Sequence, residues 1–143
     1  MLTGCSASST EEFDVFQYRG SYAGDNSAVV NTVLHLQGAD QFRGMELKTK
    51  EEPYGIIVNY DWSDSTLDAK ETTIHNASYL FALIQNVDWV TFRFEGVIDT
   101  DQYTVTREQL QALYGIEWNE IKNANELKDL IESALTDDAE ATI

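Results

Sequence analysis

The residues best placed to bind a ligand form a glycine-rich turn near the start of the chain. Arg19 precedes residues 20–26, where glycines and polar residues come immediately before a stretch with helical spacing. Glycine lets backbone approach a ligand closely, and the N–H groups at the start of a helix attract anions. The predicted ligand-binding residues are Arg19, Gly20, Tyr22, Gly24, Asp25 and Asn26. The alternative is a plain strand-to-helix turn, in which Asp25 supplies its own negatively charged cap.

Carboxylates gather in three further places. They are residues 99–101, residues 136–138 and the loop that carries Asp61, Asp64 and Asp68. Oxygen ligands suit calcium, but none of these segments has the glycine and the distal glutamate of an EF-hand loop. We therefore predict neither a metal site nor a cofactor. A hydrolase using carboxylates would need a buried acid with a shifted pKa, for which Asp61 and Asp88 are the candidates.

Other catalytic signals are missing from the sequence. It contains no phosphate-binding loop, dinucleotide fingerprint, zinc-binding helix motif or nucleophile elbow. His35 and His75 lie among apolar residues on predicted helices, with no acid or nucleophile at a catalytic spacing, so we interpret both as structural or surface residues. Asn76 begins a glycosylation sequon that its helical context makes coincidental. We assign no catalytic residue, and a non-enzymatic role is favoured.

Three tryptophans are candidate anchors of a core or of an interface. We predict that at least two of Trp62, Trp89 and Trp118 pack in the core. An exposed tryptophan on an open sheet face could mark a binding surface together with Arg93 and Lys48.

The first residues carry a possible attachment signal. Residues 2–5, Leu-Thr-Gly-Cys, resemble the lipobox of bacterial lipoproteins, in which the cysteine receives a diacylglyceryl group. Residues 6–12 are polar and small, as expected of a flexible tether. We predict lipid attachment at Cys5, on the extracytoplasmic face of the cell membrane, with Met1 lying inside a trimmed signal. The alternative is a cytosolic protein with a chance cysteine.

Length and charge limit the classes of protein to which this chain can belong. The chain has 143 residues and a formal charge of -16, which fits one domain and disfavours binding to nucleic acid. The longest apolar stretch, residues 79–84, is far shorter than the roughly twenty residues of a membrane span. Membrane contact is therefore expected only through lipidated Cys5, whose uniqueness also excludes an internal disulfide.

The elements that must position these residues follow from hydrophobic periodicity. We predict an extended segment over 13–18, a helix capped near Asp25 and stopped by Gly38, and a hairpin turning at Pro53. A core helix over 70–86 and a second hairpin from Trp89 follow. A capping box then opens a short helix at Thr106, and a last helix ends near residue 135.

This order predicts an α+β fold in which a mainly antiparallel sheet of about four or five strands packs on helices in two layers. Residues 1–12 would be the lipobox remnant and tether, 13–135 a single domain, and 136–143 an acidic tail. Polar residues such as Glu46, Lys48, Asn59, Thr91 and Arg93 would occupy the second face of the sheet.

Three stretches identify a family resemblance. Residues 18–27, 48–57 and 81–89 (YRGSYAGDNS, KTKEEPYGII and FALIQNVDW) resemble an uncharacterised family of Gram-positive bacterial proteins, catalogued as domain of unknown function four-eight-two-five. The resemblance spans about residues 13–135. It implies secreted lipoproteins or domains attached to membrane-bound regulatory proteins, and it brings no activity or residue role with it.

Together these features predict a non-catalytic, lipid-anchored, extracytoplasmic binding or sensing module that recognises an unknown small ligand or envelope protein. The alternatives are an envelope-associated hydrolase that uses carboxylates, and a cytosolic acidic adaptor.

Overall fold

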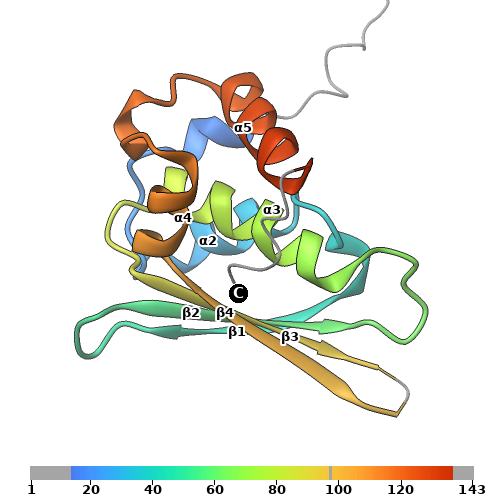
Figure 1. Cartoon of the computed structure of the whole chain (residues 1–143). Coiled ribbons are helices and arrows are strands. Elements are labelled where there is room, and N and C mark those ends of the chain that lie inside the picture. The colour runs from blue at the N-terminus through green and yellow to red at the C-terminus, as the bar shows by residue number, and fades with distance from the viewer. Residues whose placement is uncertain (1–13, 97, 137–143) are drawn as a thin grey trace, which may run out of the picture.

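The computed structural model describes residues 14–96 and 98–136. Cys5, the tether and the acidic tail beyond Thr136 lie outside the described residues. A four-stranded sheet carries helices on one face, which confirms an α+β fold (Figure 1). Among the described residues, no helix is both long and apolar enough to span a lipid bilayer.

Four seven-residue strands and helices of different lengths make up the described part of the chain. In chain order they are η1 (Val15–Tyr18), α2 (Asn26–Val33), η2 (Ala39–Gln41), β1 (Phe42–Lys48), β2 (Gly55–Asp61), α3 (Ala69–Leu83), β3 (Trp89–Glu95), β4 (Thr100–Thr106), α4 (Arg107–Tyr114), η3 (Trp118–Glu120) and α5 (Ala124–Thr136).

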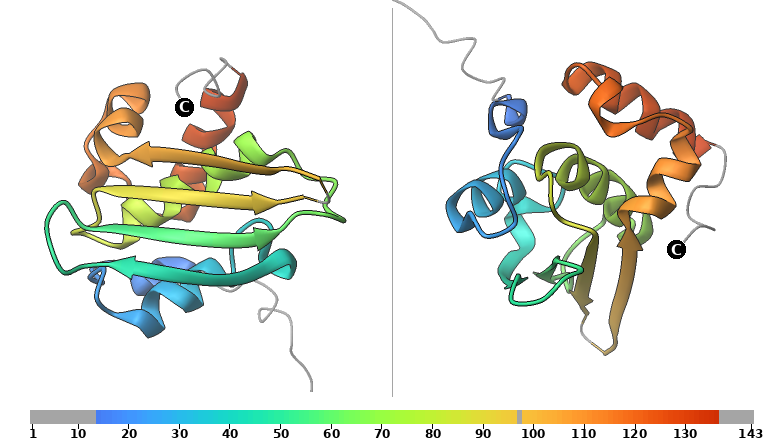
Figure 2. Two further views of the ribbon diagram at one scale, coloured as in Figure 1. Left: turned by 90° about the horizontal axis from the view of Figure 1, so that it is seen from below. Right: turned by 90° about the vertical axis from the view of Figure 1, so that its left-hand side faces the viewer.

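The sheet is mixed, with strand order β1-β2-β3-β4. Each outer pair is an antiparallel hairpin, whereas β2 and β3 run parallel. Helix α3 joins β2 to β3 and returns the chain to the same end of the sheet, which is what a parallel pair requires. The described helices all lie on one side, so the other face is open (Figure 2).

Helix α3 is the centre of the core. It packs on the covered face of the sheet and also contacts α2 and α5, so almost every residue from Thr72 to Leu83 is buried. Beneath it, Tyr60 and Phe94 stack with ring centroids 5.4 Å apart, and both side chains are fully buried. A helix that is buried on nearly all sides has no continuous polar stripe.

Two predicted boundaries are wrong. Residues 15–18 form the 3₁₀ turn η1 instead of an extended segment, because Asp14 caps the turn by accepting the Phe16 N–H at 2.9 Å. The Phe16 ring then packs edge-on against Tyr79 of α3. Helix α2 ends at Val33, before Gly38, because short turns redirect the chain and bury Leu36 in the core.

Candidate functional site

In the predicted ligand loop, the Arg19 side chain bonds to a segment far along the chain. Arg19 donates to the carbonyl oxygens of Trp118, at 2.8 Å, and of Ile121, and its guanidinium lies over the Phe16 ring. This side chain therefore joins η1 to the segment around η3. Sequence reasoning had no means of finding these partners, which lie about a hundred residues further along the chain.

The backbone of the same loop also bonds within the protein. The N–H groups of Gly20 and Ser21 donate to the Leu83 carbonyl at 3.0 and 3.2 Å, and the Ala23 N–H donates to the Asn86 side chain at 2.6 Å. Asp25 caps α2 by accepting the Ala28 N–H. Gly20, Tyr22, Gly24, Asp25 and Asn26 are exposed at the surface. A ligand site at this loop stays a prediction.

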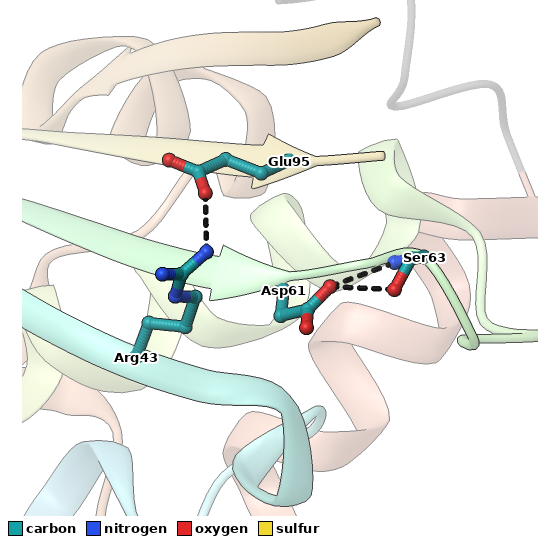
Figure 3. Close-up of polar contacts among 4 residues, drawn as sticks. All are labelled: Arg43, Asp61, Ser63 and Glu95. Carbon is teal, nitrogen blue, oxygen red and sulfur yellow. Dashed lines mark hydrogen bonds and ion pairs between the residues drawn. The ribbon is translucent and has the colours of Figure 1, made fainter. Parts of the chain in front are cut away.

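A polar cluster lies at one end of the open sheet face (Figure 3). Arg43 pairs with Glu95 at 2.6 Å, and Asp61 accepts both the hydroxyl and the N–H of Ser63, at 2.7 and 3.2 Å. These bonds lower the pKa of Asp61, first through the Ser63 hydroxyl and then through its N–H. The ionised form is favoured, so this contribution to stability is present above the ordinary carboxyl pKa and is lost as the pH falls through the lowered value.

The other acidic and imidazole groups have local roles. Asp68 caps α3 by accepting the Glu71 N–H at 3.0 Å. Nδ1 of His35 lies 2.7 Å from the Asn31 carbonyl, and Nδ1 of His75 lies 2.7 Å from the Asn76 side-chain oxygen. Burial lowers the pKa of His75. No group of three or more histidines, aspartates or glutamates in the described ranges is arranged to hold a metal ion.

Two of the three tryptophans pack in or against the core, and the third lies on the open sheet face. Trp118 is buried against Phe81, and Trp62 packs edge-on against Phe94 with ring centroids 4.6 Å apart. Trp89 begins β3 on the open face, in the same cross-strand row as Lys48 and Gly55. Its indole lies flat over Gly55 and donates to the Pro53 carbonyl at 3.0 Å.

A cleft of about 770 Å³ opens beside this indole. Four segments contribute its walls: the turn between β1 and β2, the start of β3, the first turns of α4, and the turn between α4 and η3. Its lining residues are Pro53, Asp88, Trp89, Thr106, Arg107, Glu108, Gln111, Ala112, Gly115, Ile116, Glu117 and Glu120.

Local sequence rules position the α4 wall. Thr106 and Gln109 form the predicted capping box, with reciprocal bonds of 3.1 and 2.8 Å. Gly115 ends the helix with a φ of 74°, a left-handed conformation that favours glycine. Glu120 accepts the Glu117 N–H, and Gln111 donates to the Glu117 carboxylate at 3.0 Å. The wall is therefore held in a defined shape.

The charge of the cleft is mainly negative. Four carboxylates, those of Asp88, Glu108, Glu117 and Glu120, face one guanidinium. Arg107 donates to the carbonyls of Val87 and Ile84, at 2.8 and 2.6 Å, and lies over the Phe81 and Trp118 rings. Burial lowers the pKa of Arg107, while the charge of Asp88 raises it. The Arg107 guanidinium is thus hydrogen-bonded within the protein, and the four acidic residues are exposed to solvent.

A half-buried indole beside acidic residues suits a cation that carries apolar groups. Tryptophan is the aromatic side chain that attracts cations most strongly, and carboxylates raise the local concentration of positive ligands. Sequence reasoning singled out Trp89 and the candidate carboxylate Asp88, both of which line the cleft. It did not bring them together with Pro53 or Glu108, because these residues meet only in the folded chain.

The comparisons with known proteins identify a family and nothing more. Neither the curated proteins nor the solved structures give a match. The sequence model described as a domain of unknown function (DUF4825) matches residues 15–108, from η1 through the sheet to the first turn of α4. The match covers most of the chain and includes Trp89 and Arg107, so this protein belongs to the DUF4825 family.

Proposed function

We propose that this domain is a non-catalytic binding or sensing module whose cleft beside Trp89 takes a positively charged group of a small ligand or of an envelope protein. One observation carries the proposal: the half-buried Trp89 and four exposed acidic residues line a single cleft. The formal charge of -16 adds long-range attraction for cations.

Catalysis by carboxylates has less support. A general acid that works near neutral pH needs a raised pKa. The pKa of Asp61 is lowered instead, and its side chain is exposed, as suits a surface carboxylate that stays ionised.

The lipid-anchored, extracytoplasmic location belongs to the same proposal. It is supported by the lipobox-like residues 2–5 and by the polar character of residues 6–12. Seven extended residues reach at most about 25 Å, so the ligand would be met close to the membrane of a Gram-positive cell. Expression of the full-length gene tests this. We expect the protein in the membrane fraction and its Cys5→Ser variant in the soluble fraction, whereas equal partitioning of the two would support the cytosolic adaptor.

Calorimetric titration with trilysine tests the cleft. We expect saturable binding that weakens about tenfold in Trp89→Ala, equivalent to roughly 1.4 kcal/mol, and weakens at high salt. Glu108→Gln should also weaken binding, because it removes one of the four carboxylates.

Glu132→Gln is the matched control, since it removes the same charge from an exposed position on α5 outside the cleft. Equal effects of Glu108→Gln and Glu132→Gln would show that trilysine senses only the overall charge, and the cleft would be rejected as the binding site.

A further inference from the structure

Strand β4 leaves one long edge of the sheet unpaired within the described residues. It is the outermost strand and pairs only with β3. Figure 2 shows this edge bordering the open face, with α4 and α5 extending past it on the covered side. An edge strand exposes a row of backbone donors and acceptors, onto which another strand can add.

The hydrogen bonds at the two ends of the β3–β4 hairpin show which backbone groups point outward. Gly96 donates to Asp99 at 2.8 Å, and Arg107 donates to Asp88 at 2.9 Å. Bonded and non-bonded pairs alternate along an antiparallel ladder. With the observed register, Tyr103 and Val105 are bonded to β3, so Gln102 and Thr104 direct their N–H and C=O groups away from the sheet.

Thr106 supports this assignment. It lies two residues beyond Thr104 and therefore, like Gln102 and Thr104, is not bonded to β3. Its N–H donates to the Gln109 side chain at 2.8 Å instead of to another strand. The capping box thus occupies the last outward donor of the strand. Gln102 and Thr104 remain as adjacent outward positions in the middle of the edge.

The edge of β4 carries fewer of the features that block strand addition than the opposite edge does, since Asp101 is the one charged residue of the strand. Its sequence, TDQYTVT, contains no proline, glycine or basic residue, and its register with β3 has no shift. Strand β1, at the opposite edge, has a register shift between Phe42 and Gly44 and carries the charged residues Arg43, Glu46 and Lys48. Natural sheets use bulges and charges of this kind to prevent pairing.

We propose that β4 binds an extended, uncharged or basic segment of a partner protein, which adds to the sheet as a fifth strand. Charge selects the partner, because Asp101 lies on the strand and Glu108 follows it. A second copy of this chain would bring another formal charge of -16 and another pair of overhanging helices to the same edge. Only a narrow, extended chain avoids both obstacles.

The side chains of β4 define the pattern such a segment needs. Gln102 and Thr104 face the open side, whereas Tyr103 and Val105 face the core side. A complementary strand therefore alternates polar and β-branched apolar residues. This inference concerns the middle of the β4 edge, which adjoins the cleft at Thr106 and Glu108, and it does not depend on ligand binding in the cleft.

The test is an NMR titration with the blocked peptide Lys-Thr-Val-Thr-Val-Thr-Lys. We expect saturable shifts at the amides of Gln102 and Thr104, with slower hydrogen exchange at both. A version N-methylated at every residue has no backbone donor at either edge and cannot lie against β4, so it should give neither effect. A version with terminal glutamates in place of the lysines should bind several-fold more weakly.

Two variants separate the backbone from the side chain. Thr104→Pro removes an outward donor and leaves the donors to β3 intact, so we expect a folded protein that no longer binds the peptide. Thr104→Ala loses the same hydroxyl contact with Thr91, which is 2.7 Å long, but keeps the N–H and should still bind.

Peptide shifts at Trp89 and Glu108 alone would overturn the proposal while supporting the cleft. Protection of Gln102 and Thr104 by raised protein concentration without peptide would overturn it in favour of a second copy, and the absence of any shift at these amides would also overturn it.

Discussion

Replacing Asn76 with alanine should lower the free energy of unfolding by about 3 kcal/mol, because its amide satisfies several buried groups at once. Asn76 is 1% exposed on α3. Its Nδ2 donates to the Gln37 carbonyl at 2.8 Å and to the Tyr60 hydroxyl at 3.0 Å, and its Oδ1 accepts the Gln37 N–H at 3.2 Å. The side chain joins the core helix to β2 and to the turn that precedes β1.

The alanine variant leaves these partners buried without replacements. The Tyr60 hydroxyl is enclosed, and burial holds its pKa well above the usual value, so it stays neutral and needs a partner for its proton or its oxygen. Unpaired buried groups each cost about 1–3 kcal/mol, which sets the expected total once partial relaxation is allowed. Urea denaturation followed by circular dichroism measures the change.

Asn31→Ala on the exposed face of α2 provides the matched control. It removes the same amide from a solvated position and should change stability by less than about 0.5 kcal/mol. Similar changes in unfolding free energy in both variants would show that the buried hydrogen bonds of Asn76 contribute nothing to stability.

The sequence predicts the parts of this fold that local chemistry determines. The capping box at Thr106, the helix end at Gly115 and the reversal after Pro53 depend on residues within a few positions of one another. Alternating side chains identified both hairpins, because successive residues of a strand point to opposite faces of the sheet. Asn76, in contrast, drew notice in the sequence only as the start of a coincidental sequon, and the packing of α3 shows that it is buried.

The features missed by the sequence depend on distant partners. Residues 15–18 alternate as a strand does, but the docking of Phe16 on Tyr79 suits a single turn. The parallel pairing of β2 with β3 follows from where α3 packs. The cleft unites Pro53, Trp89 and Glu108, whose convergence no local pattern encodes. The loop around Arg19 had a strong local signal, and long-range bonds give that side chain a structural role.

Replacing Gly55 with alanine should displace the Trp89 indole, which would both lower the stability of the sheet and change the shape of the cleft. A Cβ atom at Gly55 would lie 1.9 Å from Cε2 and 2.2 Å from Cδ2 of Trp89, far inside contact distance. The ring must swing away, because the Gly55 backbone is held between β1 and β3. It then loses the 3.0 Å bond to the Pro53 carbonyl.

We expect the free energy of unfolding of Gly55→Ala to fall by about 2 kcal/mol, as is usual when extra volume is forced into a packed contact. Binding of trilysine should weaken as well, since the indole wall moves. Chemical denaturation measures the first effect, and calorimetric titration with trilysine measures the second. The NMR position and hydrogen exchange of the Trp89 indole N–H show whether the ring has moved.

Gly44→Ala is the control, because it makes the same glycine-to-alanine change without a contact to the Trp89 ring. Gly44 lies on the neighbouring strand of the same sheet, and a Cβ atom there would meet nothing within 4 Å. Alanine at this position should be neutral or stabilise by about 0.5 kcal/mol, because it restricts the unfolded chain. If Gly55→Ala matches this control and the indole signal stays in place, the Trp89 ring is not fixed over Gly55, and the cleft has no rigid aromatic wall for a cation to bind.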